Sequence, residues 1–328
     1  MTGSRRLLAR FALATLCVVL LVVAARSIDI GRTVAEVRTA HLWWLVGATA
    51  SYFLILPLWA EQWRFLSPRS SRGSRREMFA VVAMAASAHN TMFALAGETA
   101  TVLLLVTRIG LERAAAVAVL LLDQLLVGLA KIVLLAVAAF VLSSSMRESS
   151  GSLADVRASS GGALALVAGV VLLLVALVAF AHRETANERT TSWLPLRLRP
   201  HVIAVAQALA PLRDRRALLA FFLALAKKGC ELVAIVLVQR AFRVELPFGS
   251  AVLILAALNL ATIIPIVPGN AGVYEAAVVW TYVRLGVSLE RATGMAVAQH
   301  ACYLAALALP GYRWLTGSDP LRSAAAVA

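Results

Sequence analysis

The sequence predicts an all-α polytopic membrane protein with about six full transmembrane helices and two broken, re-entrant hairpins arranged as inverted repeats. Hydrophobic residues make up 61% of the chain, far above the share in a soluble domain. Several apolar runs reach the length of about 20 residues that a helix needs to cross a bilayer. A glycine-broken hydrophobic stretch carrying a glutamate occurs twice, as in membrane proteins built from internal repeats. We expect one transmembrane domain over residues 1–328.

Six apolar runs are predicted to cross the membrane completely. They lie at about 7–25, 42–60, 114–142, 161–181, 217–239 and 292–316. The first run follows Arg5 and Arg6 and ends in small residues at Ala25, as a signal peptide does. Because further spans follow and continue the same topology, we interpret it as an uncleaved first helix.

A four-residue motif, called here the twice-written phrase, occurs at two places in the chain. Leu111-Glu112-Arg113-Ala114 and Leu289-Glu290-Arg291-Ala292 each follow an Arg-x-Gly turn. Upstream of each copy come an asparagine in an apolar run, a break with glycine, and a glutamate. The residues concerned are Asn90, Gly97 and Glu98 in the first copy, and Asn259, Gly269, Gly272 and Glu275 in the second. We therefore expect related halves at about 42–142 and 217–316, with a site between them.

Each half is predicted to contain a broken hairpin. The hairpin helices are expected at about 79–95 with 98–109, and at about 248–265 with 272–285. The second break contains Pro265, Pro268, Gly269, Asn270 and Gly272. Proline has no backbone N–H, and glycine tolerates positive φ, so this stretch does not continue a helix. Such irregular backbone is tolerated inside a membrane where protein covers it or where it lines a wet cavity.

Arginine-rich segments assign the sides of the membrane. The N-terminus and the segments 61–78 and 182–216 are rich in arginine and are predicted to be cytoplasmic, whereas 143–160 is nearly neutral and is predicted to lie outside. These side assignments are consistent with one another only if each hairpin enters and leaves the membrane on the same side. The first hairpin would then open to the cytoplasm and the second to the outside, with both termini inside. The net charge of +14 follows from these loops and indicates anionic phospholipid as a partner, not nucleic acid.

Five charged residues lie deep within apolar runs. They are Asp123, Lys131, Lys227, Lys228 and Glu231. Each isolated charge at a helix centre costs about 2.5–3.5 kcal/mol on insertion scales, so these residues need partners or water. Asp123 and Lys131 are too far apart on one helix to pair, at about 12 Å along the axis. We expect Lys227 to pair with Glu231 and Lys228 with Asp123, either as a structural lock between helices or as part of a site.

The glutamates and asparagines near the breaks allow two interpretations. Glu98 and Glu275 either complement the dipole of the helix that follows, or they bind a cation, a proton or an amine headgroup near the midplane. Asn90 and Asn259 either tie helices together by hydrogen bonds or line the site.

The other polar residues suggest no catalytic machinery. Trp43, Trp44, Trp59 and Trp63 are interpreted as interfacial anchors, and His300 as a packed helix residue. The cysteines lie in apolar runs as small hydrophobic residues; they are Cys17, Cys230 and Cys302. We find no motif for a metal, a cofactor or a nucleophile with its base, and expect none of them.

The stretch Pro265-x-x-Pro-Gly-Asn-Ala-Gly-Val-Tyr-Glu275, with Asn90, Gly97-Glu98 and Asp123 upstream, resembles the lysylphosphatidylglycerol synthase transmembrane-region family, also called flippase-like. The resemblance runs from the second helix to the end of the chain. It implies an integral bacterial or archaeal inner-membrane protein. In fused members this region moves an aminoacylated phospholipid between leaflets, and stand-alone members are linked to the export of lipids or lipid-linked sugars.

This chain differs from the family pattern in several places. We expect a stand-alone member without the soluble aminoacyltransferase domain, so the resemblance does not imply aminoacyl transfer. The family usually has arginines where this chain has Ala96 and Leu120, and a glycine in place of Asn270. Because arginine binds phosphate strongly, their absence leaves Glu98 and Glu275 as a relatively acidic pair facing the predicted cavity.

The function we expect is translocation of a phospholipid or lipid-linked headgroup between leaflets of the inner membrane, with the headgroup bound between the two hairpins. The half-helix N-termini after Gly97 and Gly272 would add backbone donors, and Lys227 or Lys228 would balance a phosphate. One alternative is a non-transporting scaffold or regulatory subunit with an envelope enzyme as its partner. Another is an intramembrane lipid-modifying enzyme using Asp123 with Lys228, or His300 with Glu275. The sequence does not name the lipid or the oligomeric state.

Overall fold

The computed structural model describes residues 29–68, 73–92, 94–150, 169, 215–262 and 267–315. The predicted helices at 7–25 and 161–181 lie outside these residues, as does Pro265. All regular secondary structure in the described part is helical. Its elements are α2 (Ile30–Thr39), α3 (Leu42–Phe53), α4 (Ile55–Leu66), α5 (Arg75–Thr91), α6 (Ala94–Ile109), α7 (Arg113–Ser150), α10 (Arg215–Ala241), α11 (Phe248–Ala261), the 3₁₀ turn η4 (Pro268–Asn270), α12 (Val273–Arg284), α13 (Leu289–Leu307) and α14 (Leu309–Leu315).

Three helical segments of the described chain are long and apolar enough to cross a membrane. They are Leu42–Leu66, Arg113–Phe140 and Leu289–Leu315. Helix α10, with 27 residues, has the length as well, but it carries two lysines and a glutamate near its middle. The chain is therefore a helical, multi-pass membrane protein. The count of six full spans stays a prediction.

Two of these long segments bend at a proline. The span predicted at 42–60 consists of α3 and α4, which meet at Leu54 and continue to Leu66. The last span changes direction at Ala308, between α13 and α14. Pro57 and Pro310 lie just beyond these points and cannot donate the next helical hydrogen bond.

The first hairpin breaks earlier than the sequence predicts. Helix α5 ends at Thr91 and α6 begins at Ala94, so Gly97 lies inside α6 and is not the break. Its role is close packing, since a Cβ at Gly97 would lie 3.1 Å from the Cα of His89 on α5. Consequently Glu98 is not in the first turn of its helix, and the predicted half-helix start after Gly97 is wrong.

The second break has the irregular backbone that its composition predicts. Helix α11 ends at Ala261 and α12 begins at Val273. Gly269, Asn270 and Gly272 all have positive φ, of 61°, 55° and 83°. Asparagine is among the non-glycine residues that adopt this conformation most readily, so Asn270 fits the positive φ of this turn.

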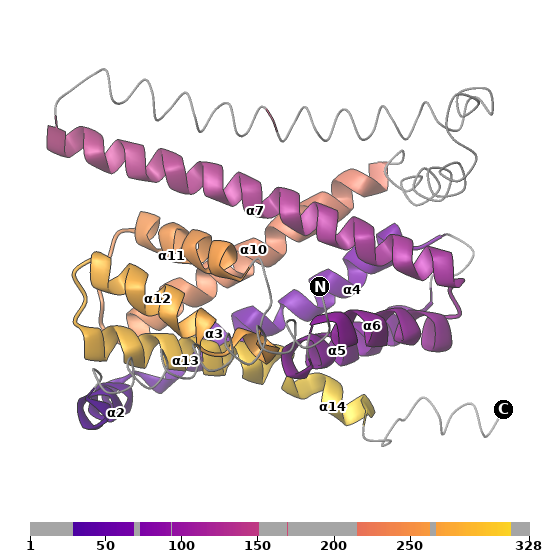
Figure 1. The fold of residues 1–328 in the computed structure, drawn as a ribbon, viewed down its shortest axis with the longest axis horizontal. Coiled ribbons are helices and arrows are strands. Elements are labelled where there is room, and N and C mark those ends of the chain that lie inside the picture. Colours follow the sequence, from indigo (N-terminus) through magenta and orange to yellow (C-terminus); the bar gives the residue numbers. More distant parts are fainter. Residues whose placement is uncertain are drawn as a thin grey trace, which may run out of the picture.

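The two helix pairs lie at opposite ends of the molecule. Figure 1 shows α5 with α6 beside one half of the long helices, and α11 with α12 beside the other half. Helix α7 runs along both and contacts α6 and α11, while α13 contacts both α12 and α5. The turn η4 of the second break packs against α5. The two breaks therefore approach each other near the middle of the bundle.

The twice-written phrase lies at the turn after each pair. Helix α6 is followed by Gly110 with φ 77°, and α12 by Gly286 with φ 88°, before the long helices α7 and α13 begin. Both copies therefore use a left-handed glycine to reverse the chain. The phrase itself forms the rim where each hairpin leads into a long helix.

A short helix near the N-terminus was not predicted. Asp29 caps α2 by accepting the N–H of Arg32, and Glu36 pairs with Arg291 at the start of α13. Two features of the sequence could have predicted this helix. They are the capping residue Asp29 and the helical spacing of the apolar residues Ile30, Val34 and Val37.

Candidate functional site

Asp123 and Lys227 form a buried ion pair between α7 and α10. Lys227 Nζ lies 3.3 Å from Asp123 Oδ1, and the two residues are 5% and 2% exposed. Trp59 of α4 donates from Nε1 to Asp123 Oδ2 at 2.9 Å, and its ring centroid lies 5.1 Å from the Lys227 ammonium. Both carboxylate oxygens are thus occupied, as a buried charge requires. Trp63 is fully buried and Trp59 is half-buried against the core, so both pack inside the bundle and are not the interfacial anchors that the sequence suggests.

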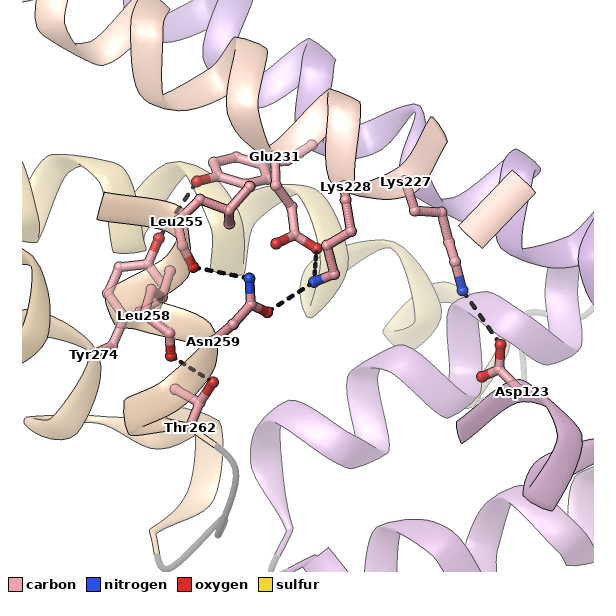
Figure 2. A network of polar contacts seen from close by, with 10 residues as sticks. Asp123, Lys227, Lys228, Glu231, Leu255, Leu258, Asn259, Thr262 and Tyr274 are labelled. Carbon is pink, nitrogen blue, oxygen red and sulfur yellow. Dashed lines mark hydrogen bonds and ion pairs between the residues drawn. The ribbon is translucent and has the colours of Figure 1, made fainter. Parts of the chain in front are cut away.

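Lys228 connects α10 to the second hairpin. Its Nζ donates to Glu231 Oε1 at 2.6 Å and to Asn259 Oδ1 of α11 at 3.1 Å. Figure 2 shows the two lysines pointing to different neighbours, Lys227 toward Asp123 and Lys228 toward Asn259. The predicted pairs, Lys227 with Glu231 and Lys228 with Asp123, are therefore wrong.

Lys131 is the one lysine of this region without a partner in the described part of the chain. It is half-buried on α7, close enough to Lys228 and Glu231 to interact with both charges. No hydrogen bond or ion pair joins it to a described residue. We call Asp123, Lys131, Lys227, Lys228 and Glu231 the charge cluster. Its three lysines face two carboxylates, so one positive charge is unmatched.

The helices that precede the two breaks end in the same way. Asn90 donates to Ala86 O at the end of α5, and Asn259 donates to Leu255 O at the end of α11, both at 2.8 Å. Thr91 and Thr262 make equivalent 2.8 Å bonds to carbonyls four residues back. Such side-chain bonds compete with the helical ladder and bend or end a helix, which gives Asn90 and Asn259 a structural role.

The two breaks touch at Asn90 and Gly269. A Cβ at Gly269 would lie 2.9 Å from the carbonyl oxygen of Asn90, so only glycine fits. Asn90 also interacts with Tyr303 of α13. Here glycine is required both by its φ and by the close approach of another backbone.

Glu275 has two hydrogen-bonding partners. Its Oε2 accepts the N–H of Gly272 at 2.7 Å and so caps α12, while its Oε1 lies 2.6 Å from Nδ1 of His300 on α13. The ring of Tyr274 stacks on the imidazole with centroids 4.2 Å apart. The structure thus supports the capping interpretation of Glu275, and it brings together Glu275 and His300, the pair that the sequence analysis considered only for an intramembrane enzyme.

Tyr274 extends this group toward α3. Its hydroxyl accepts from Gln299 Nε2 at 2.8 Å and lies 3.3 Å from the hydroxyl of Tyr52. Tyr52 and Tyr303 make an edge-to-face contact. These aromatic residues fill the space between the second break and the charge cluster.

The remaining predicted residues are more separate. Glu98 is half-buried on α6, and no hydrogen bond or ion pair joins it to another described residue. Pro268 begins η4. No group of three metal-ligating side chains occurs among the described residues. A surface pocket between α2 and α13 is lined by Arg32, Glu36, Glu290 and Arg291, among others, and by none of the predicted site residues.

Comparison with protein families identifies a match over most of the chain. The family described as the lysylphosphatidylglycerol synthase TM region matches residues 7–311. The comparison with curated proteins found no match, and neither did the comparison with solved structures.

Proposed function

Because the chain belongs to the lysylphosphatidylglycerol synthase transmembrane-region family, we propose that it moves a phospholipid or lipid-linked headgroup between the leaflets of a membrane. The headgroup binds between the two hairpins, near the contact of their breaks. Each hairpin enters and leaves the membrane on one side, and the two open to opposite sides.

The observation that carries this proposal is the unmatched charge of Lys131. A cation in a membrane interior is strongly unfavourable without a partner. A lipid phosphate supplies the missing negative charge and accepts several hydrogen bonds. Lys131 and Lys228 interact electrostatically, and in this proposal they bind the anion in place of Lys227, which is already paired with Asp123. The two lysines thereby supply the positive charge that arginines provide in the family, at the positions where this chain has Ala96 and Leu120.

Glu98 and Glu275 have different roles in this proposal. Glu275 is occupied by Gly272 and His300, whereas Glu98 is free to contact a cationic part of a headgroup. An amine-bearing or zwitterionic phospholipid would then place its phosphate at Lys131 and its amine near Glu98. The site is therefore proposed to take a headgroup carrying both charges, or a plain anionic one.

The surroundings follow from this role. We propose that the protein lies in the inner membrane with both termini in the cytoplasm, where the arginine-rich segments contact anionic phospholipid. An envelope enzyme that makes or uses the lipid is the partner to expect.

The test is leaflet exchange in liposomes that contain the purified full-length protein. Fluorescent phospholipids with anionic, zwitterionic and amine-bearing headgroups are scored by their accessibility to an added quencher. We expect faster exchange than in protein-free liposomes, and a loss of about tenfold for Lys131→Gln. The matched control is Arg240→Gln, which removes a positive charge from the exposed end of α10 and should change nothing.

Two results would contradict the proposal. Exchange no faster than in protein-free liposomes, for every headgroup, would favour the scaffold function. A substrate-dependent product detected by mass spectrometry would favour the intramembrane enzyme, for which the Glu275–His300 contact supplies a candidate pair. The other pair considered, Asp123 with Lys228, does not form because Lys227 occupies Asp123.

A further inference from the structure

The contact between Glu275 and His300 has the geometry of a proton-binding pair. Oε1 of Glu275 lies 2.6 Å from Nδ1 of His300, so this imidazole nitrogen has a hydrogen-bond partner. When Nδ1 donates to a carboxylate, the neutral imidazole keeps its lone pair on Nε2. That lone pair is the atom that takes up a proton, as in other carboxylate-oriented histidines.

The second nitrogen of His300 has no partner in the described part of the chain. Nε2 is buried without a hydrogen bond, and the side chain as a whole is 4% exposed. A buried polar atom left unsatisfied is unfavourable and calls for an explanation. A proton arriving at Nε2, with water or a headgroup as its hydrogen-bond partner, is such an explanation.

Protonation changes the charge of this pair in a favourable direction. With neutral His300 the pair carries the single negative charge of Glu275. Proton uptake forms an Nε2–H bond and makes the pair electrically neutral, which reduces its cost within a membrane.

The pair is also connected to the second break. Glu275 Oε2 accepts the N–H of Gly272, the residue with φ 83° that ends the break. A change in the charge of His300 therefore acts, through the carboxylate of Glu275, on the cap of α12 and on the break that touches Asn90. The site of protonation and the contact between the two hairpins share one carboxylate.

Other ionisable groups surround the pair but do not bind it. The elements that pack against α12 and α13 bring these titratable or charged residues, some of them distant along the helices: Glu36, Tyr52, His89, Lys228, Glu231, Tyr274, Tyr303 and Arg313. Of the carboxylates, Glu231 is bound to Lys228 and Glu36 to Arg291. Glu275 is the carboxylate that contacts His300.

We propose that Glu275 and His300 bind the proton that drives lipid movement. The inference rests on the proposed function and adds its energy source. A proton taken up at His300 on one side is released on the other as the hairpins change their exposure. The direction of lipid movement then follows the pH difference across the membrane.

The experiment measures the steady-state leaflet distribution of a fluorescent phosphatidylglycerol in liposomes containing the full-length protein. A pH difference of one unit is imposed while valinomycin and potassium hold the membrane potential at zero. One coupled proton skews the distribution up to about tenfold, because each pH unit is worth one decade in the equilibrium constant. Reversing the pH difference should reverse the skew.

Variants of Glu275 and His300 test whether the skewed lipid distribution depends on this pair. In His300→Gln and Glu275→Gln the pH difference should no longer skew the lipid distribution; Glu275→Gln keeps an oxygen to cap α12, so it also serves if His300→Gln fails to fold. The matched control is His41→Gln, since His41 is an exposed histidine at the start of α3 whose Nε2 accepts a hydrogen bond from Arg243. It should keep the full skew.

The outcomes separate the two proposals. Lipid exchange by the wild type without any skew overturns the proton site and leaves the proposed function standing. A full skew in both His300→Gln and Glu275→Gln also overturns the site. If the wild type moves no lipid at all, the proposed function fails, and the proton coupling fails with it.

Discussion

Adjacent lysines on α10 serve two different neighbours. Successive residues of a helix point about 100° apart, so Lys227 reaches Asp123 on α7 while Lys228 reaches Asn259 on α11. Helix spacing allowed Glu231 to pair with either lysine. The choice depends on which helices pack on each side of α10, and sequence spacing does not contain that information.

Removing Asp123 should destabilise the protein strongly. Asp123→Asn leaves the ammonium of Lys227 buried without its counter-charge, which costs about 3–5 kcal/mol when a buried pair is broken. Replacing both residues by leucine removes the need for a counter-charge and should recover most of that loss. Unfolding of the three proteins in the same detergent measures this. An Asp123→Asn variant as stable as wild type would show that the ion pair is not formed.

Gly269 should tolerate no side chain. In Gly269→Ala the new Cβ would meet the Asn90 carbonyl at 2.9 Å on a backbone with φ 61°, and strain of this kind costs about 1–3 kcal/mol. The control, Gly128→Ala, adds a Cβ in open space on α7 and should be neutral or slightly stabilising. Thermal unfolding compares them. Equal stability of the two variants would contradict the contact between the breaks.

At the scale of elements, the sequence predicted the helix pairs better than their ends. Charge, prolines and glycines located the second break correctly, because these residues act through local backbone conformation. The first break was misplaced because Gly97 serves packing against His89 and not chain reversal. Its actual end is set by His89, Asn90 and Thr91, whose side chains bond back to α5.

The close packing of α14 on α5 gives a prediction at this scale. A Cβ at Gly311 would overlap the Ala83 carbonyl and the Ser87 hydroxyl, and Ser87 itself donates to Ala308 O at the bend. Gly311→Ala should push α14 away and cost about 1–3 kcal/mol, as overpacking does. Gly229→Ala on α10, where nothing lies nearby, is the control. Crosslinking yield between cysteines on α5 and α14 reports the displacement; an unchanged yield and stability would count against this packing.

At the scale of the whole molecule, the two halves contain the same parts in the same order. Each has an asparagine-ended helix, a break, a second helix, a left-handed glycine and a long helix. The contact between the breaks depends on packing over long sequence separations and could not be predicted from local patterns. The same is true of the contact between Glu275 and His300, which depends on α13 lying beside α12.

The proposed inverted arrangement of the halves predicts that the starts of α7 and α13 are exposed on opposite sides of the membrane. Glu112 and Ser288 are exposed at the starts of the long helices. Single cysteines at these positions, in a background without Cys17, Cys230 and Cys302, should react with a membrane-impermeant thiol reagent from opposite sides of sealed vesicles. Labelling of both from one side would exclude inverted repeats.

The central claim is that an anionic headgroup balances Lys131 between the two hairpins. Native mass spectrometry of the purified protein, with identification of copurified lipids, tests it directly. We predict that the wild type retains a phosphate-bearing lipid, and that Lys131→Gln loses most of it while Arg240→Gln does not. A wild type free of such lipid, or equal retention by Lys131→Gln, would contradict the claim.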